Sequence, residues 1–125
     1  MACHTVFIIS NEAAIRDVLV ELVVAAGLHA VTLSSLKACL EALRSEPHCC
    51  LVLDGGIDDK LEPDRQVNFA SVCSKIPVLV LTERGDIPTA VHAIRQGALD
   101  VIQKPLQHES ILERIKSMVA ANIIR

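Results

Sequence analysis

The chain has 125 residues, which fits one domain and leaves little room for a second. Hydrophobic residues make up 51% and charged residues 22%, which argues against disorder, and no apolar run approaches the roughly 20 residues of a membrane span. A net charge of −3 and a shortage of aromatics, with two Phe and no Trp or Tyr, argue against direct nucleic-acid binding. We therefore expect one folded cytoplasmic domain, covering residues 1–125, with an aliphatic core.

Short apolar runs of strand length alternate with segments of helical periodicity. The runs lack polar alternation, which is typical of strands buried on both faces of a parallel sheet. Five strands alternating with five helices predict a (βα)5 doubly wound, five-stranded parallel sheet of the α/β class. In chain order the predicted elements are strand Val6–Ile9, helix Ile15–Ala26, strand Ala30–Leu33, helix Leu36–Leu43, strand Cys49–Leu53, helix Phe69–Cys73, strand Val78–Leu81, helix Ala90–Ile94, strand Leu99–Ile102 and helix Ile111–Val119.

Local signals mark several of the boundaries. Gly27 is placed to end the first helix, and the fourth helix should begin near Asp86 and stop at Gly97. The least regular segment is Gly55–Arg65, which is rich in acidic residues and is predicted to be an exposed loop. The five cysteines follow no zinc-binding spacing, so they are interpreted as small buried hydrophobes.

Polar residues stand where each of four predicted strands ends. In a doubly wound sheet the functional site lies at the carboxyl ends of the strands, so these residues are the candidates for chemistry. They are Ser10, Asn11 and Glu12 after the first strand, Asp54 after the third, Thr82 and Glu83 after the fourth, and Lys104 and Pro105 after the fifth.

This set resembles the receiver domain of bacterial response regulators, which have the flavodoxin-like fold of CheY. The resemblance rests on an acid after the third strand, a hydroxyl after the fourth and Lys104-Pro105 after the fifth. The segments Ile76–Ala90 and Gly97–Asp100 look most like receivers of the FixJ type. The resemblance implies a cis peptide bond before Pro105, and a DNA-binding output domain that follows the receiver in the complete regulator.

The resemblance also implies a phosphoryl switch. Asp54 would take the phosphoryl group of a phosphohistidine on a sensor histidine kinase. Thr82 and Lys104 would assist by donating to the phosphoryl oxygens, because phosphoryl transfer mainly requires alignment and positive charge. A Mg²⁺ ion normally supplies further charge. Its ligands would be Asp54, the carbonyl of Gly56 and acids at the end of the first strand.

The metal site departs from the family pattern. Ser10 and Asn11 stand where receivers carry two acids, and neutral groups are weak ligands for Mg²⁺. We expect magnesium binding to be weak or absent unless Glu12 compensates. Two simpler interpretations remain open: Asn11 is the N-cap of the first helix, and Lys104 pairs with Asp54 without any metal.

A second departure concerns the output face. Val101 replaces an aromatic residue whose movement follows the threonine in receivers, which puts that coupling in doubt. The fourth helix, fifth strand and fifth helix form the usual receiver dimer face, so 91–95, 101 and 111–118 are candidates for a homodimer contact. Charged residues there, such as Arg95, Asp100 and Arg114, are candidates for ion pairs between subunits.

Two functions remain open at this stage. The first is a phosphorylated receiver of a transcriptional two-component system with impaired magnesium chemistry. The alternative is a pseudo-receiver that acts as an interaction or dimerisation module without phosphorylation. An enzyme is not expected, because the chain has no P-loop and no G-x-G-x-x-G, and Cys49-Cys50 lies inside a strand where thiols are inert.

Overall fold

A computed structural model describes residues 5–45, 49–55 and 63–124 of the chain. Five parallel strands form one sheet in the order β2-β1-β3-β4-β5. Since strand order reverses next to β1, the connections run to both faces of the sheet, as in a doubly wound fold. The strands are β1 Thr5–Ile9, β2 His29–Thr32, β3 Cys49–Asp54, β4 Val78–Thr82 and β5 Asp100–Gln103.

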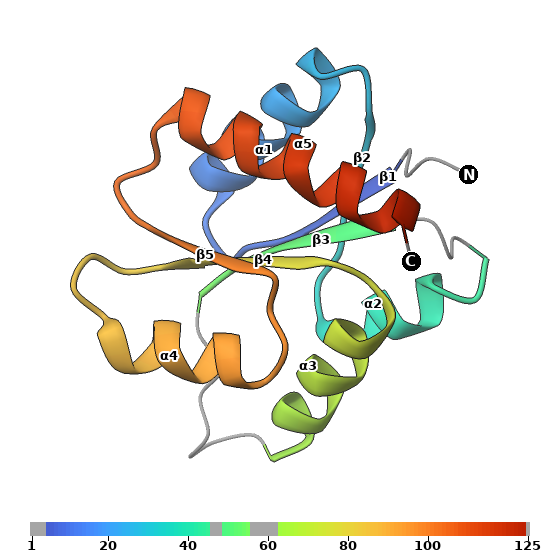
Figure 1. The fold of residues 1–125 in the computed structure, drawn as a ribbon. Helices are drawn as coiled ribbons and strands as arrows, with labels where there is room; N and C mark the ends of the chain where they lie inside the picture. Colours follow the sequence, from blue (N-terminus) through green and yellow to red (C-terminus); the bar gives the residue numbers. More distant parts are fainter. Residues whose placement is uncertain (1–4, 46–48, 56–62, 125) are drawn as a thin grey trace.

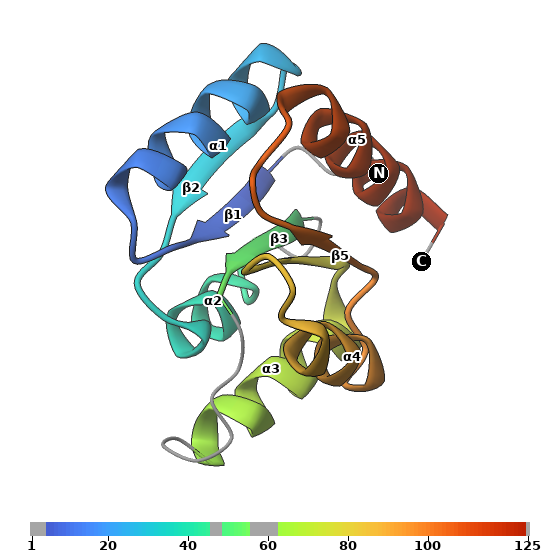
Figure 2. The same cartoon turned by 90° about the vertical axis from the view of Figure 1, so that its left-hand side faces the viewer.

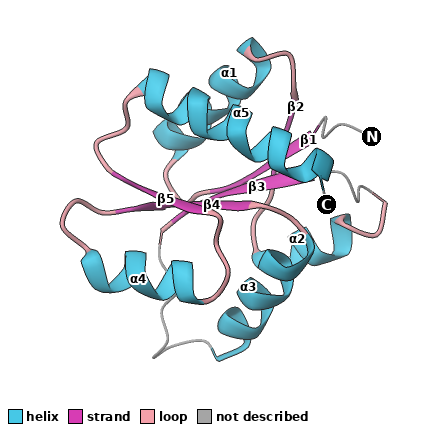
Figure 3. Ribbon diagram, viewed as in Figure 1, coloured by secondary structure: helices cyan, strands magenta, loops and turns pink. Residues whose placement is uncertain are grey.

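Helices cover both faces of the sheet. Figures 1 and 2 show α1 and α5 on one face and α2, α3 and α4 on the other, and Figure 3 shows the strands as the layer between them. This three-layer arrangement is the one that the alternating sequence pattern predicts. The helices are α1 Ala13–Ala25, α2 Leu36–Ala42, α3 Pro63–Lys75, α4 Ile87–Arg95 and α5 His108–Ile124.

The core consists of two layers, one on each face of the sheet. Alternate residues of the central strands point to opposite faces, so Ile8 packs toward α1 and α5 while Phe7 packs toward α2 and α3. Leu19 and Ile115 fill the first layer and Phe69 the second, all fully buried. Each such side chain contributes about 1.5–3 kcal/mol, so these layers hold the strand ends in fixed positions.

The type and order of all ten elements are confirmed, with two corrections. Only β1, β3 and β4 are buried along their whole length, whereas β2 and β5 are partly exposed because they form the sheet edges. The predicted loop Gly55–Arg65 is too long at its end, because α3 already begins at Pro63, a residue suited to a first helical turn. Residues 56–62 lie outside the described part.

The cysteines of the described chain are buried thiols, as predicted: Cys39, Cys49, Cys50 and Cys73. Burial raises the pKa of Cys39 to about 12, so this thiol is not a thiolate at neutral pH. Cys3 lies outside the described residues. Within the described part of the chain, no helix is long and apolar enough to cross a membrane.

Candidate functional site at the carboxyl edge of the sheet

Three of the predicted site residues meet where β3, β4 and β5 end. Asp54 is the last residue of β3, Thr82 is the last of β4, and Lys104 follows β5. The backbone N–H of Lys104 donates to the carbonyl of Thr82 at 2.8 Å, and the N–H of Gly55 donates to the carbonyl of Leu81 at 2.9 Å. The sheet itself therefore fixes where these side chains start. The cis peptide bond between Lys104 and Pro105 is confirmed.

The Asp54 carboxylate is buried and engaged on both oxygens. Its side chain is 4% exposed. Lys104 Nζ lies 2.8 Å from Asp54 Oδ1, and the Ser10 hydroxyl donates to Asp54 Oδ2 at 2.7 Å. The Lys104 contact is an ion pair that lacks hydrogen-bond alignment, because Oδ1 has no hydrogen-bond donor among the described residues. The predicted pairing of Lys104 with Asp54 is therefore present, and the hydroxyl of Ser10 engages the second carboxylate oxygen.

Lys104 is shared among three carboxylates. Besides Asp54, its ammonium donates to Glu83 Oε1 at 2.9 Å and lies 3.5 Å from Glu12 Oε1. Burial lowers the pKa of Lys104, but the contacts with Asp54 and Glu83 outweigh burial and raise this pKa above its ordinary value of 10.5. Lys104 is thus positively charged at neutral pH. Glu83 also belongs to the site: the sequence places it after the fourth strand but does not predict its ion pair with Lys104.

Thr82 presents a buried hydroxyl at this edge. The residue is 1% exposed, and its Oγ1 has no hydrogen-bond partner among the described residues. A buried hydroxyl without a partner costs about 1–3 kcal/mol, so such a group is uncommon unless it serves a ligand. A hydroxyl that capped the following loop would carry such a hydrogen bond, and Thr82 Oγ1 carries none among the described residues.

Ser10 holds the loop between β1 and α1 in place through several hydrogen bonds. Its Oγ accepts a hydrogen bond from the backbone N–H of Glu12 at 3.1 Å while donating to Asp54. Its carbonyl accepts from Arg16 Nη1 at 2.7 Å. Ser10 is 6% exposed, so this short loop is tied to both Asp54 and α1. Sequence reasoning missed Arg16, which looks in the sequence like any polar residue of α1.

The interpretation of Asn11 as a helix N-cap is wrong. The N-cap of α1 is Glu12, and its side chain makes no capping hydrogen bond. The N-cap lies one residue later than expected because the Ser10 hydroxyl already accepts from the N–H of Glu12, which completes the turn into the helix. Asn11 itself is exposed.

The described residues do not form the carboxylate cluster that a divalent cation prefers. Asp54 is the one buried acid of the described chain, and Ser10 and Lys104 engage both of its oxygens. The side chain of Glu12 is 59% exposed and is directed to Lys104. Among the described residues, no three His, Cys, Asp or Glu side chains are grouped to hold a metal. Gly56 lies outside the described residues, so weak magnesium binding stays a prediction.

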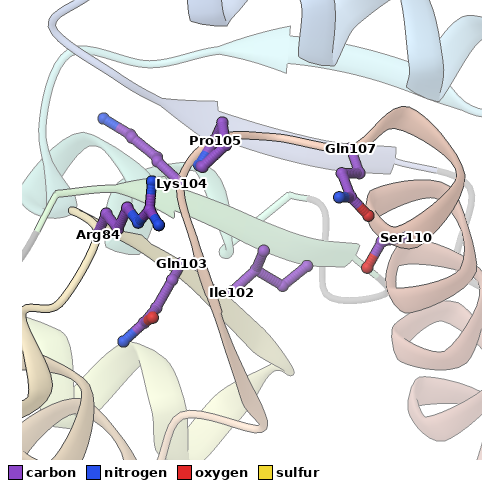
Figure 4. A pocket seen from close by; sticks show the side chains of 7 residues that line it. All are labelled: Arg84, Ile102, Gln103, Lys104, Pro105, Gln107 and Ser110. Carbon is purple, nitrogen blue, oxygen red and sulfur yellow. The ribbon is translucent and has the colours of Figure 1, made fainter.

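A cleft of about 450 Å³ borders the site on the side of β5 and α5. It is lined by Arg84, Lys104 and the residues that join β5 to the first turn of α5, among them Gln107 and Ser110. In the view of Figure 4, Arg84, Gln103 and Lys104 are drawn on one side of the β5 backbone, and Gln107 and Ser110 on the other. Arg84 and Lys104 are the two cations of this lining, and Lys104 is at the same time paired with Asp54, Glu83 and Glu12.

The output face carries an ion pair within the chain, between Arg114 of α5 and Asp100 of β5. Ion pairs between subunits stay a prediction. Val101 is half-buried and packs against the core layer beneath the sheet, as an ordinary strand residue does. On α4, Ile87, Val91 and Ile94 are exposed although they are large and apolar.

The chain belongs to the response regulator receiver domain family. The family model matches residues 6–116, which include every element from β1 into α5. Receiver domains are signalling modules, and the fold, the strand order and the acid at the end of β3 agree with this assignment.

Named relatives are bacterial response regulators. The chain is 31% identical over 118 residues to the transcriptional regulatory protein TdiR of Thauera aromatica, covering 94% of this chain and 52% of TdiR. It is 32% identical to the response regulator protein TmoT of Ectopseudomonas mendocina, covering 90% of this chain and 51% of TmoT. The crystal structure of FixJ-N matches with a TM-score of 0.79 at 29% identity, covering 96% of each chain. The chain spans about half the length of these curated relatives.

Proposed function

We propose that this chain is the receiver of a transcriptional two-component regulator, in which Asp54 accepts a phosphoryl group from a sensor histidine kinase. Residues 1–125 form that receiver, and an output domain outside this chain makes the contact with DNA. The similarity to TdiR and TmoT, which are about twice as long, supports this arrangement. The domain acts in the cytoplasm as a signalling module and is not an enzyme with a substrate of its own.

The observation that carries the proposal is the buried hydroxyl of Thr82. It stands at the same sheet edge as Asp54 and Lys104 and makes no hydrogen bond within the described chain. A phosphoryl group on Asp54 would bring three acceptor oxygens to this edge, which suits one donor hydroxyl and one ammonium. A purely structural Asp54–Lys104 ion pair gives no reason to keep a buried hydroxyl unpaired beside it.

In the proposed step, an oxygen of Asp54 attacks the phosphorus of the donor phosphohistidine. The phosphorus–nitrogen bond breaks, and its electron pair returns to the imidazole nitrogen, which takes up a proton. The product is an acyl phosphate on Asp54. Lys104 neutralises the charge of the phosphoryl oxygens, and the hydroxyl of Thr82 donates to one of them.

The cleft beside Lys104 supports a route for the donor. It opens between the residue after Glu83 and the first turn of α5, and its lining includes the cations Arg84 and Lys104. A phosphohistidine that enters there would pass Arg84 before it reaches Lys104 and the buried carboxylate.

The proposed phosphorylation depends little on magnesium, because the site is a poor binding site for Mg²⁺. The hydroxyl of Ser10 is already bonded to Asp54, and Asn11 contributes no charge. A divalent cation would have to displace Ser10 and Lys104 from the carboxylate while gaining a single buried acid as ligand. We therefore propose that Mg²⁺ adds little to phosphorylation.

A second function is favoured by the exposed apolar row on α4. Ile87, Val91 and Ile94 recur at intervals of four and three residues, so they lie on one side of the helix. An interaction module that works without phosphorylation would use such a row, and a homodimer through α4, β5 and α5 is the partner we propose for it.

The dimer is tested by sedimentation of the wild type and of Val91→Glu. Val24→Glu is the matched control, because Val24 is equally large, is exposed and lies on α1. We expect Val91→Glu to weaken self-association and Val24→Glu to leave it unchanged. Equal behaviour of the two variants would argue against this face.

Labelling with phosphoramidate, with and without Mg²⁺, tests the acceptor function. Intact-protein mass spectrometry should detect one phosphoryl adduct that forms slowly, reaches a low level and is lost in Asp54→Asn. Mg²⁺ should change its rate little. The matched control is Asp86→Asn, since Asp86 is the carboxylate that caps α4 and is not among the described partners of Lys104, which are Glu12, Asp54 and Glu83.

The possible results separate the two functions. Near-stoichiometric labelling of Asp54 that requires Mg²⁺ would reject the impaired chemistry and the pseudo-receiver together. No adduct on Asp54, even with a kinase that labels a related receiver, would reject the acceptor function and leave the interaction module.

A further inference from the structure

Glu83 competes with Asp54 for the ammonium of Lys104. Glu83 Oε1 accepts a hydrogen bond from Lys104 Nζ at 2.9 Å, while the Asp54 contact of 2.8 Å lacks hydrogen-bond alignment. The side chain of Glu83 is 70% exposed and that of Asp54 is 4% exposed. Because an exposed ion pair is held weakly, an anion that arrives at Lys104 displaces Glu83 more readily than Asp54.

The backbone of Glu83 is bound directly to the start of α4. Glu83 begins a compact turn in which its carbonyl accepts from the N–H of Asp86 at 3.1 Å. The N–H of Ile87 donates to the carbonyl of Gly85 at 2.9 Å, and Gly85 adopts a φ of 80° that favours glycine. Asp86 then caps α4 by accepting from the N–H of Thr89. A change at Glu83 is therefore transmitted to α4 through the hydrogen-bonded turn 83–86.

α4 is the helix that such a change moves most easily. Ala93 is its one buried residue, whereas Ile87, Val91 and Ile94 are exposed. A helix with so little buried apolar surface is held weakly against the sheet. On the neighbouring strand, Val101 is short and packs against the core, so this position offers no long side chain for the same purpose.

We propose that Glu83 is a positioning residue that links the occupancy of Lys104 to the placement of α4: an anion at Lys104 releases Glu83, and the turn 83–86 carries the release to α4. Where that anion is the phosphoryl group of Asp54, the inference rests on the proposed function. The link between Lys104, Glu83 and α4 is a property of the unphosphorylated domain and is testable without phosphorylation.

Amide chemical shifts in ¹H–¹⁵N NMR spectra test the link. Glu83→Gln should shift the amides of 87–95, because the ion pair that holds the turn is lost. Glu12→Gln is the matched control, since it also removes a carboxylate from Lys104 but lies on the loop after β1. It should leave α4 unchanged. Shifts confined to 82–85, or equal α4 shifts in both variants, would overturn the proposal.

A double-mutant comparison excludes a merely local effect of the new side chain. Lys104→Gln removes the same ion pair from the other partner, so it should reproduce the α4 shifts of Glu83→Gln. The double variant should then add almost nothing. If Lys104→Gln leaves α4 unchanged, or if the two effects add in full, the ion pair is not the link and the proposal fails.

Phosphoramidate labelling tests the competition. Without the competing carboxylate, Glu83→Gln should label Asp54 about two- to fivefold faster than the wild type, the range expected for loss of one exposed ion pair. Equal, measurable rates would overturn the competition. If neither protein is labelled, the acceptor function fails, while the NMR comparison still decides whether Glu83 positions α4.

Discussion

The two sides of the carboxyl edge differ in how strongly the fold constrains them. On the side of β4 and β5, Thr82 and Lys104 are joined by a backbone hydrogen bond and stand at the ends of paired strands. On the side of β1, Asn11 and Glu12 are exposed and lie in the short loop before α1. The proposed site has its hydroxyl and lysine on the constrained side, and the neutral residues Ser10 and Asn11 follow β1 on the loop side.

This difference separates two requirements of phosphoryl chemistry. Alignment depends on Asp54, Thr82 and Lys104, all of which the sheet holds in place. Neutralisation of charge normally involves a metal and its acids, and here the hydroxyl of Ser10 occupies Asp54 Oδ2 instead. Under the proposed function, one side of the edge keeps the alignment and the other has given up the metal, so Lys104 is left with most of the positive charge.

The largest expected effect comes from removing Lys104. Lys104→Met leaves the carboxylate of Asp54 buried without its cation, which should lower the free energy of unfolding by about 2–3 kcal/mol. Asp54→Asn should cost less than about 1 kcal/mol, because Lys104 keeps Glu83 and Glu12 as partners. Urea denaturation of both variants measures the difference. Equal losses of unfolding free energy in the two variants would mean that Asp54 without Lys104 is no more destabilising than Lys104 without Asp54, which contradicts this prediction.

The pH dependence of this difference has a definite sign. The pKa of Lys104 is raised above 10.5 in the folded protein, so its stabilisation is fully present below that pH and is lost as pH rises through the folded-state pKa. The gap between wild type and Lys104→Met should stay constant from about pH 7 to 9 and shrink in more alkaline solution. A gap that changes between pH 7 and 9 would point to another titrating group.

The sequence predicts the residues at the strand ends better than those in the turns that follow them. Asp54, Thr82 and Lys104 come together because parallel strands end at one edge, which depends only on the order of the elements. The bonds of Ser10 with Asp54 and of Glu83 with Lys104 depend on side-chain directions in turns. Periodicity contains no information on such directions, which is why the N-cap at Asn11 was predicted wrongly and Glu83 had no predicted partner.

An intermediate effect is expected from restoring the acids on the loop side. Ser10→Asp/Asn11→Asp adds two carboxylates beside Asp54 and removes the hydroxyl that engages Oδ2. Its affinity for Mg²⁺ should exceed that of the wild type at least about tenfold, or about 1.4 kcal/mol, whereas the wild type should show no saturable binding at millimolar Mg²⁺. NMR shifts near Asp54 during a Mg²⁺ titration provide the measurement.

A neutral exchange, Ser10→Asn/Asn11→Ser, is the control for this experiment, because it changes the same positions without adding charge. It should bind Mg²⁺ no better than the wild type. If the acidic variant also fails to bind, the defect lies in the segment 55–63 after Asp54. Saturable binding by the wild type would instead show that Glu12 compensates for the missing acids.

The smallest expected effect comes from Ser10→Ala. The hydroxyl donates to Asp54 and accepts from the N–H of Glu12, so its removal should cost about 1 kcal/mol in urea denaturation. Ser74→Ala is the matched control, since that exposed hydroxyl bonds to the carbonyl of Ser71 in its own helix. In an Asp54→Ala background the cost of Ser10→Ala should fall by about half, because only the bond with Glu12 is left to lose. An undiminished cost there would mean that Ser10 stabilises the loop alone, and the loop side of the edge would then be independent of Asp54.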